Sequence, residues 1–370
     1  MNSRERMLCA LDRGVPDRLP VTVHQWQQFH LDHYMGGASR VEAFQQTGLD
    51  AQVQYFGEVG QAQEQGEAPA LEASDWRIEL EERQETDDVV LSSYTVHTPD
   101  GNLSYSTGSN ERTTWTTEYL IKKDEDIELI RKYMPVPELN NQAVRELYDK
   151  VGDAGILRGF VWGGQAGCWQ HACCLMEMDK LILACFDKPD WVHELLDILL
   201  QKKLQFVETM EVAKFDLVET GGGASSSTLI SPDIHRRFCL PYDRKLHRAL
   251  HRHDFRISYH TCGGTKNIEE YIVKNECDVS ETLAPSTIGG NQEPWEFAEK
   301  IDGRLGLIGG IDQFSVLTHG SPGDVRETVH ELFEKVGQDG GYICSACDHF
   351  FDVPPENLRA MGEAARECTY

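Results

Sequence analysis

Residues 257–264 read Ile-Ser-Tyr-His-Thr-Cys-Gly-Gly, and this stretch organises the interpretation of the whole chain. Residues 255–259 alternate apolar and polar side chains, which predicts a β-strand. The strand runs into His260-Thr261-Cys262 and two glycines, and residues 267–273 then follow a helical pattern. An imidazole and a thiol two residues apart, on the loop that leaves a strand, can both point at one soft metal ion. The pair alone is a weak signal, so its meaning depends on which further ligands the chain brings to it.

Length and charge restrict the class of protein. A chain of 370 residues is long enough for one large α/β domain or for two ordinary ones. Its formal net charge of -26 argues against nucleic acids and anionic membranes as partners. The first residues lack the apolar core of a secretory signal, and no apolar run approaches the length that spans a membrane. We therefore expect a soluble cytoplasmic protein.

The chain has 11 cysteines, an odd number. A disulfide framework does not fit a chain of this size without a secretory signal. We expect most of the thiols to be small buried side chains. Only the cysteines beside histidines or at the ends of strands are candidates for chemistry.

The first third of the chain contains a segment that differs from the rest. Residues 57–72 are rich in Gln, Glu and Gly, which predicts a surface loop. Alternating patterns then predict strands over 76–82, 89–97, 102–106 and 113–122. Asp100-Gly101 between two of them is a hairpin signal. We interpret 57–122 as a loop and β-rich insertion. Its sheet either only packs on the main domain or also forms a lid or docking surface.

From residue 124 onward, short β-rich runs alternate with helical segments. The predicted strands are 155–161, 215–219, 255–259, 279–283, 305–308 and 342–344. The predicted helices are 124–133, 140–151, 176–185, 189–213, 232–252, 267–274, 294–301, 322–336 and 355–367. This alternation implies a parallel sheet, and candidate strands at 18–23 and 50–55 bring the strands to eight. We predict a single (β/α)8 TIM barrel domain over residues 1–370, with a doubly wound open sheet as the alternative.

In such a barrel the functional residues lie on loops at the carboxyl ends of the strands. Strand 215–219 ends in Glu219, and the last strand leads to Cys347. We therefore predict a metal site formed by His260, Cys262 and Cys347, a zinc-like ligand set that leaves a fourth position open. Glu219 or His349 could fill that position in the resting enzyme. The alternative is a hydrogen-bonded histidine beside unreactive cysteines.

Three other clusters have less specific patterns. Cys168-x-x-His171-x-Cys173-Cys174 lies between a strand and a helix among large apolar residues, which favours packing over a second metal site. Residues 220–227 are rich in Gly and Ser but lack the lysine and spacing of a P-loop, which favours a loop that shapes the substrate site. Asp312 follows another strand and is a candidate helix cap, substrate contact or turn residue.

At these residues the chain resembles the uroporphyrinogen decarboxylase superfamily, and within it the cobalamin-linked methyltransferases. The resemblance rests on residues 4–11, 16–20, 229–232, 240–242, 260–263, 307–312, 340–343 and 353–357. It extends nearly from end to end and implies the (β/α)8 barrel of that superfamily.

Two branches of the superfamily differ near the first strand. The resemblance to the decarboxylases implies an arginine-rich stretch there, whereas residues 23–29 read Val-His-Gln-Trp-Gln-Gln-Phe. A multiply anionic porphyrinogen would lack its counter-charges at this place. The methyltransferase branch carries a zinc site written His-x-Cys … Cys, which His260, Cys262 and Cys347 match. Because the loop before Cys347 is one residue shorter than in that branch, Cys344 remains an alternative ligand.

The resemblance implies a zinc-dependent methyltransferase that moves a methyl group between a corrinoid and a small thiol or an O- or N-methylated substrate. Glu219 would be a displaceable fourth ligand or a proton carrier. No Asp-x-His-x-x-Gly corrinoid motif occurs: Asp233-Ile-His235 comes nearest, but Phe238 stands where glycine is needed. We therefore expect the corrinoid (cobalamin) on a separate carrier protein. A cofactor-free decarboxylase or lyase is the alternative, and a non-catalytic binding protein is a third.

Overall fold

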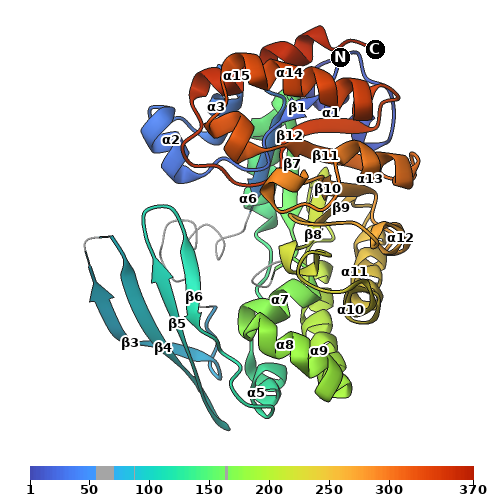
Figure 1. The fold of residues 1–370 in the computed structure, drawn as a ribbon. Helices are drawn as coiled ribbons and strands as arrows, with labels where there is room; N and C mark the ends of the chain where they lie inside the picture. The colour runs from blue at the N-terminus through green and yellow to red at the C-terminus, as the bar shows by residue number, and fades with distance from the viewer. Residues whose placement is uncertain (56–70, 87, 163–165) are drawn as a thin grey trace.

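The structure is a computed structural model that describes residues 1–55, 71–86, 88–162 and 166–370 (Figure 1). Most of the loop predicted over residues 57–72 lies outside the described residues. Within them, a barrel of parallel strands is surrounded by helices, and a second, antiparallel sheet stands beside it (Figure 1).

Eight parallel strands form the barrel, in the order β1-β12-β11-β10-β9-β8-β7-β2. Their bounds are β1 Val21–Thr22, β2 Ala51–Tyr55, β7 Gly155–Phe160, β8 Leu217–Gly221, β9 Ile257–His260, β10 Val279–Thr282, β11 Gly306–Ile311 and β12 Tyr342–Ala346. The first and last strands of this order meet through the Asp50 N–H, which donates to the Val21 carbonyl at 2.8 Å. The Gln54 side chain adds a hydrogen bond to the His24 carbonyl at 2.9 Å. The predicted (β/α)8 barrel is confirmed.

Most of the α-helices from residue 124 onward begin and end near the predicted positions, and the helix over residues 168–175 was not predicted. The α-helices surround the barrel. They are α1 Ser3–Leu11, α2 Gln28–Tyr34, α3 Arg40–Thr47, α5 Asp126–Tyr133, α6 Asn141–Val151, α7 Cys168–Leu175, α8 Met178–Asp187, α9 Pro189–Glu208, α10 Pro232–Ile234, α11 Leu240–His251, α12 Glu269–Lys274, α13 Pro294–Ile301, α14 Pro322–Leu332 and α15 Pro355–Glu367. Several begin with proline, whose missing N–H costs nothing in the first turn. Among the described residues, no helix combines the length and the apolar character needed to cross a bilayer.

Shorter helical turns connect some of these elements. They are the 3-10 turns η1 Gly152–Ala154, η2 Gly223–Ser225 and η4 Ser286–Ile288, and the π turns η3 His235–Cys239, η5 Gln313–Thr318 and η6 Phe333–Gly337. The helix predicted over 232–252 is therefore divided by η3. Pro241 has no N–H to donate to the carbonyl four residues earlier, which explains a wider turn here. Asp312 accepts hydrogen bonds from the Phe314 and Ser315 N–H groups, so it caps η5.

Side chains fill the barrel in two layers. The layer near the amino-terminal ends of the strands is apolar, and α1 closes that end of the barrel. It contains Met7, Ala10, Leu11, Ile156, Leu217, Val279, Ile308 and Ile343. Because side chains two positions apart point to the same face of a strand, the residues two places further along β7, β8 and β10 also face inward. These residues are Arg158, Glu219 and Glu281, so the carboxyl end of the barrel is polar.

The β-rich insertion forms an antiparallel sheet in the order β3-β4-β5-β6. Its strands are β3 Arg77–Glu85, β4 Val90–Thr98, β5 Gly101–Ser109 and β6 Thr114–Glu118. The hairpin predicted at Asp100-Gly101 joins β4 and β5, so the predicted excursion is confirmed. Val96 and Leu103 of this sheet share the core with Ile127 and Ile130 of α5, and Figure 1 shows the sheet and α5 side by side. That the chain forms a single domain stays a prediction.

Candidate active site

The carboxyl end of the barrel holds a buried cluster of charged side chains. Arg158 from β7 is fully buried and pairs with two carboxylates. Its Nη2 lies 2.5 Å from Oε2 of Glu219 on β8, and it also contacts Oε1 of Glu281 on β10. The two carboxylates compensate the charge of the buried guanidinium. Removing either partner would leave a buried charge without compensation. The cluster therefore fixes the two carboxylates in the barrel.

The two carboxylates have different protonation behaviour. Burial raises the pKa of Glu219, although Arg158 and His260 act in the opposite direction. Burial also opposes ionisation of Glu281, but Arg158 and the hydrogen bond with His260 outweigh it and lower the pKa of Glu281. The surroundings therefore favour the ionised form at Glu281 and the protonated form at Glu219.

His260, at the end of β9, is oriented by this carboxylate pair. Its Nδ1 lies 2.9 Å from Oε1 of Glu281 and 3.6 Å from Oε1 of Glu219. Burial opposes protonation of His260, but Cys262 and Glu219 outweigh it and raise the pKa of the imidazole. Because Nδ1 is engaged by Glu281, Nε2 is the nitrogen left for a ligand or a metal ion.

Three groups of possible metal ligands meet at this place. Each contributes one ligand atom per residue, and the atoms of a group lie within 4.8 Å of one another. One group is His24, Glu219, His260 and Glu281; the second is His260, Cys262 and Asp348; the third is His24, Asp348 and His349. The groups share members, so they form one continuous site. The His24 ring lies between the others, with its centroid 4.8 Å from that of His260 and 5.5 Å from that of His349.

Asp348 and His349 form the outer side of the site, on the segment that follows β12. The backbone N–H of His349 donates to Oδ1 of Asp348 at 2.7 Å. Burial opposes ionisation of Asp348, but His349 and His260 outweigh it and hold the pKa of the carboxyl below its usual range. The two side chains are 30% and 45% exposed, which leaves this side open to a substrate.

The predicted ligands do not all come together. His260 and Cys262 do, since both belong to one group of ligand atoms. Cys347 is 1% exposed, and its Sγ lies 3.8 Å from the carbonyl oxygen of Leu283. Burial raises the pKa of the Cys344 thiol to about 12. Within the described ranges, neither Cys347 nor Cys344 joins a group of three possible ligands.

The glycine-rich loop after β8 lies directly against Cys262. A Cβ added to Gly223 would stand 2.6 Å from the Cys262 Sγ, so this position has no space for a side chain. α7 supports the same loop: the Ala224 N–H donates to Gln170, and the Trp169 indole donates to the Ala224 carbonyl. The Cys168–Cys174 cluster lies on α7, where Cys168, Trp169, His171 and Cys173 are buried, as the packing interpretation predicts.

The structure brings more candidate residues to the site than the sequence interpretation named. Arg158, Glu281, His24 and Asp348 were not predicted. For Arg158 the available signal was a charged residue inside an otherwise apolar strand, because such a residue faces a polar interior or a partner. The strand of Glu281 reads Val-Ser-Glu-Thr and carries no such contrast. His24 lies just past the first strand, where strand-end reasoning applies. Asp348 follows Cys347 directly, and the cysteine was preferred as a ligand because zinc sites favour thiolates.

A parallel barrel that gathers imidazole, thiol and carboxylate groups at its carboxyl end defines a (β/α)8 protein with a candidate active site at the barrel mouth. Comparison with known proteins is more specific. The model of the family described as "Uroporphyrinogen decarboxylase (URO-D)" matches residues 80–368, which is most of the chain. The chain belongs to the uroporphyrinogen decarboxylase family.

The chain is similar to members with different names. A methylcobamide:CoM methyltransferase from Methanosarcina mazei is 23% identical over 260 residues, covering 68% of this chain and 71% of that protein. A uroporphyrinogen decarboxylase from Xylella fastidiosa is 21% identical, covering 100% of this chain and 99% of that protein. Among solved structures, a methyltransferase from Methanosarcina mazei superposes with a TM-score of 0.68 at 18% identity, covering 99% of each chain. At this identity the structural likeness establishes the fold alone.

Proposed function

We propose that this protein is a zinc-dependent methyltransferase that moves a methyl group between a corrinoid on a separate carrier protein and a small thiol or an O- or N-methylated substrate. The observation that carries the proposal is the meeting of His260 and Cys262 with a carboxylate at the carboxyl end of the barrel. Similarity to a methylcobamide:CoM methyltransferase supports the methyl transfer. The sequence-based expectation of a cytoplasmic protein stays a prediction.

The donor atoms fit a zinc ion. Zinc binds imidazole nitrogen, thiolate sulfur and carboxylate oxygen, and three protein ligands leave a fourth position for substrate. His260 and Cys262 would hold the ion. The third ligand is either Cys347, as the sequence predicts, or a carboxylate of the same site. When bound, zinc would stabilise charge on the heteroatom whose bond to methyl is made or broken, and the corrinoid would carry the methyl group.

The remaining side chains prepare the site. Glu281 accepts a hydrogen bond from Nδ1 of His260 and so presents Nε2 to the metal position. Arg158 keeps both carboxylates in place inside the barrel. Glu219, whose pKa is raised by burial, is suited to accept or return the proton of a thiol substrate. In a resting enzyme, Glu219 could also be the fourth ligand that substrate displaces.

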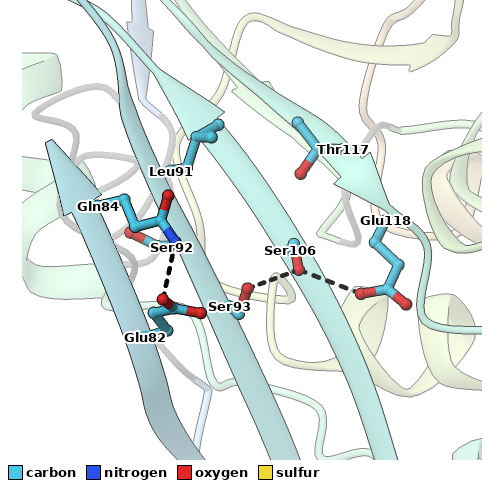
Figure 2. A pocket seen from close by; sticks show the side chains of 8 residues that line it. All are labelled: Glu82, Gln84, Leu91, Ser92, Ser93, Ser106, Thr117 and Glu118. Atoms are coloured by element: carbon cyan, nitrogen blue, oxygen red, sulfur yellow. Dashed lines mark hydrogen bonds between the residues drawn. The ribbon is translucent and has the colours of Figure 1, made fainter. Parts of the chain in front are cut away.

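We propose the antiparallel sheet as the contact surface for the carrier protein. The tip of the β5–β6 hairpin reaches the barrel mouth, where Arg112 Nη1 lies 2.7 Å from Asp352 and its guanidinium lies 4.6 Å from the Phe29 ring centroid. Figure 2 shows a polar pocket on the sheet, in which Ser93, Ser106 and Glu118 form a chain of hydrogen bonds. A surface of this kind beside the mouth could receive a carrier that presents its corrinoid to the site.

Metal content and turnover test the function together. Protein purified without added metal should contain about one zinc ion per chain, as expected for a three-ligand catalytic site. Cys262→Ser should lose the metal, whereas Cys9→Ser, a control in α1, should keep it. Methyl transfer should require both zinc and methylcobalamin or a corrinoid protein. Turnover that proceeds without either one would contradict the proposal.

Decarboxylation is the second candidate, because a relative named uroporphyrinogen decarboxylase covers the whole chain. Arg158 could not serve as the counter-charge for substrate carboxylates, since Glu219 and Glu281 already neutralise it. A metal-free protein that decarboxylates a porphyrinogen under strong chelation would establish this alternative instead.

A further inference from the structure

We propose that Asp348, in place of Cys347, completes the metal site with His260 and Cys262, so that the ion is held by one nitrogen, one sulfur and one oxygen. This inference rests on the metal dependence of the proposed function and specifies its ligand set. The juxtaposition that carries it is direct: one ligand atom from each of His260, Cys262 and Asp348 lies within 4.8 Å of the other two.

Two of the three side chains are oriented by a neighbour, and the third has space made for it. His260 Nδ1 is held by Glu281 at 2.9 Å, which leaves Nε2 unengaged by that carboxylate. Asp348 Oδ1 accepts the His349 N–H at 2.7 Å, which leaves Oδ2 as the second oxygen for an ion. The Cys262 Sγ lies where Gly223 has no side chain. In metal sites, contacts of this kind orient the side chains that bind the ion directly.

Cys347 lies apart from these ligands. Its N–H donates to the Ile311 carbonyl at 3.0 Å, and its Sγ lies 3.8 Å from the Leu283 carbonyl oxygen. Both contacts direct the residue toward the ends of β10 and β11. The resemblance implies one residue fewer before Cys347 than in the methyltransferase branch, which would place the next side chain, Asp348, at the ligand position.

A carboxylate in place of a second thiolate changes the chemistry of the ion. A second thiolate favours soft ions such as zinc, whereas a carboxylate is a harder ligand that also suits other divalent ions. A site with one thiolate also places more positive charge on the ion, since a carboxylate donates less electron density than a thiolate. The site should therefore be a stronger Lewis acid than one with two thiolates, which suits polarisation of an ether or amine oxygen or nitrogen.

Cobalt(II) titration of the metal-stripped, full-length protein tests the ligand set without relying on activity. Thiolate ligands give cobalt(II) a charge-transfer absorption, so its loss reports loss of a sulfur ligand. Cys262→Ser should abolish this absorption and Cys347→Ser should leave it unchanged. Asp348→Ala should weaken cobalt and zinc binding by at least about tenfold, measured by competition with a chromophoric chelator. Asp348→Cys should add a second thiolate absorption.

The outcomes separate this inference from the proposed function. If Cys347→Ser loses part of the absorption while Asp348→Ala binds cobalt as the unaltered protein does, the inference is wrong and the zinc methyltransferase proposal stands. If the ligand set is as proposed but no methyl transfer occurs, only the function fails. An unaltered protein that binds neither ion overturns both. Asp348→Asn, which keeps the size of the side chain, replaces Asp348→Ala if that variant does not fold.

Discussion

Glu281 connects the charge cluster of the barrel to the imidazole of His260. It is 1% exposed, contacts Arg158, and lies 2.9 Å from Nδ1 of His260. A carboxylate on the outer nitrogen of a ligand histidine fixes its tautomer and increases its basicity. In the proposed metal site, Glu281 would therefore act on the ion through His260, without being required as a ligand itself.

Replacing this carboxylate by its amide tests that role. In Glu281→Gln, the amide oxygen can still accept the imidazole N–H, but the negative charge is lost. We expect zinc affinity to fall roughly 10–100-fold, the size usual for an outer partner of a ligand histidine. Competition with a chelator measures the affinity. Glu299→Gln, an exposed change on α13, is the matched control and should bind zinc as tightly as the unaltered protein. Equal zinc affinities in both variants would show that Glu281 does not contribute to zinc binding.

At this scale, sequence reasoning found the residues that lie on one short loop. His260 and Cys262 were predictable because the strand before them and the glycines after them have clear patterns. Glu219 was predicted as the end of strand 215–219, whereas it lies inside β8, where its side chain faces the barrel interior. The approach of Asp348 to His260 and Cys262 was not predictable, since adjacent residues at the end of a strand point in different directions. The contacts of Arg158 and Glu281 become predictable only once the order β10-β9-β8-β7 is known.

At the scale of elements, the loop after β8 and the loop after β9 are fitted to each other. Gly223 belongs to η2, and it allows Cys262 to approach closely. In Gly223→Ala, the new Cβ would stand 2.6 Å from the Cys262 Sγ, so one of the loops must move. We expect weaker zinc binding by about tenfold or more, because ligands must lie within a few tenths of an ångström of their places.

Gly323→Ala is the matched control for this change. Gly323 lies in the first turn of α14, where an added Cβ would meet only the Ser321 hydroxyl at 3.5 Å, an ordinary contact. Alanine favours helix there, so the control should be as stable as the unaltered protein or slightly more so. Thermal unfolding and chelator competition on both variants measure the two effects. Unchanged zinc affinity in Gly223→Ala would show that the two loops are not coupled.

The antiparallel sheet gives a second prediction at this scale. Arg112 and Asp352 form an ion pair with side chains 40% and 38% exposed, and such a pair stabilises a protein by less than about 1 kcal/mol. Arg112→Ala should therefore leave the unfolding temperature almost unchanged but release the hairpin tip from the barrel mouth. Hydrogen exchange at residues 109–114 should become faster. Arg83→Ala, an exposed change on β3 of the same sheet, should leave that exchange as it was.

The alternation of strands and helices was sufficient to predict the architecture, because each strand–helix unit packs on the next in the same way. Helices α13 and α15 begin and end at the predicted residues, where proline and flanking turn residues define the limits. The division of residues 232–252 by η3 was not predicted, because an amphipathic pattern continues through a π turn. The order of the strands around the barrel follows from closure of the whole sheet. This order decides which side chains meet at the site.

At the scale of the whole molecule, a buried acid between the barrel and its outer helices affects the pH dependence of folding. Asp243 on α11 is 2% exposed, and its Oδ2 accepts the Tyr259 hydroxyl of β9 at 2.9 Å. Burial raises its pKa to about 7, although Tyr259 and Lys203 act in the opposite direction. The folded state thus binds the proton of Asp243 more tightly than the unfolded state does.

The sign of the effect follows from this difference. The contribution of a group with a raised folded pKa is fully present below its unfolded pKa, roughly 4 for Asp, and is lost as the pH rises toward about 7. Between about pH 5 and about pH 8, Asp243 should therefore reduce the free energy of unfolding by on the order of 2–3 kcal/mol. Asp243→Asn keeps an oxygen for the Tyr259 hydroxyl and removes the titration. Denaturant unfolding at both pH values should show a smaller loss of stability in this variant than in the unaltered protein. Asp187→Asn, an exposed change on α8, should lose as much unfolding free energy between the two pH values as the unaltered protein does. Equal losses in all three proteins would mean that Asp243 does not control the pH dependence of the fold.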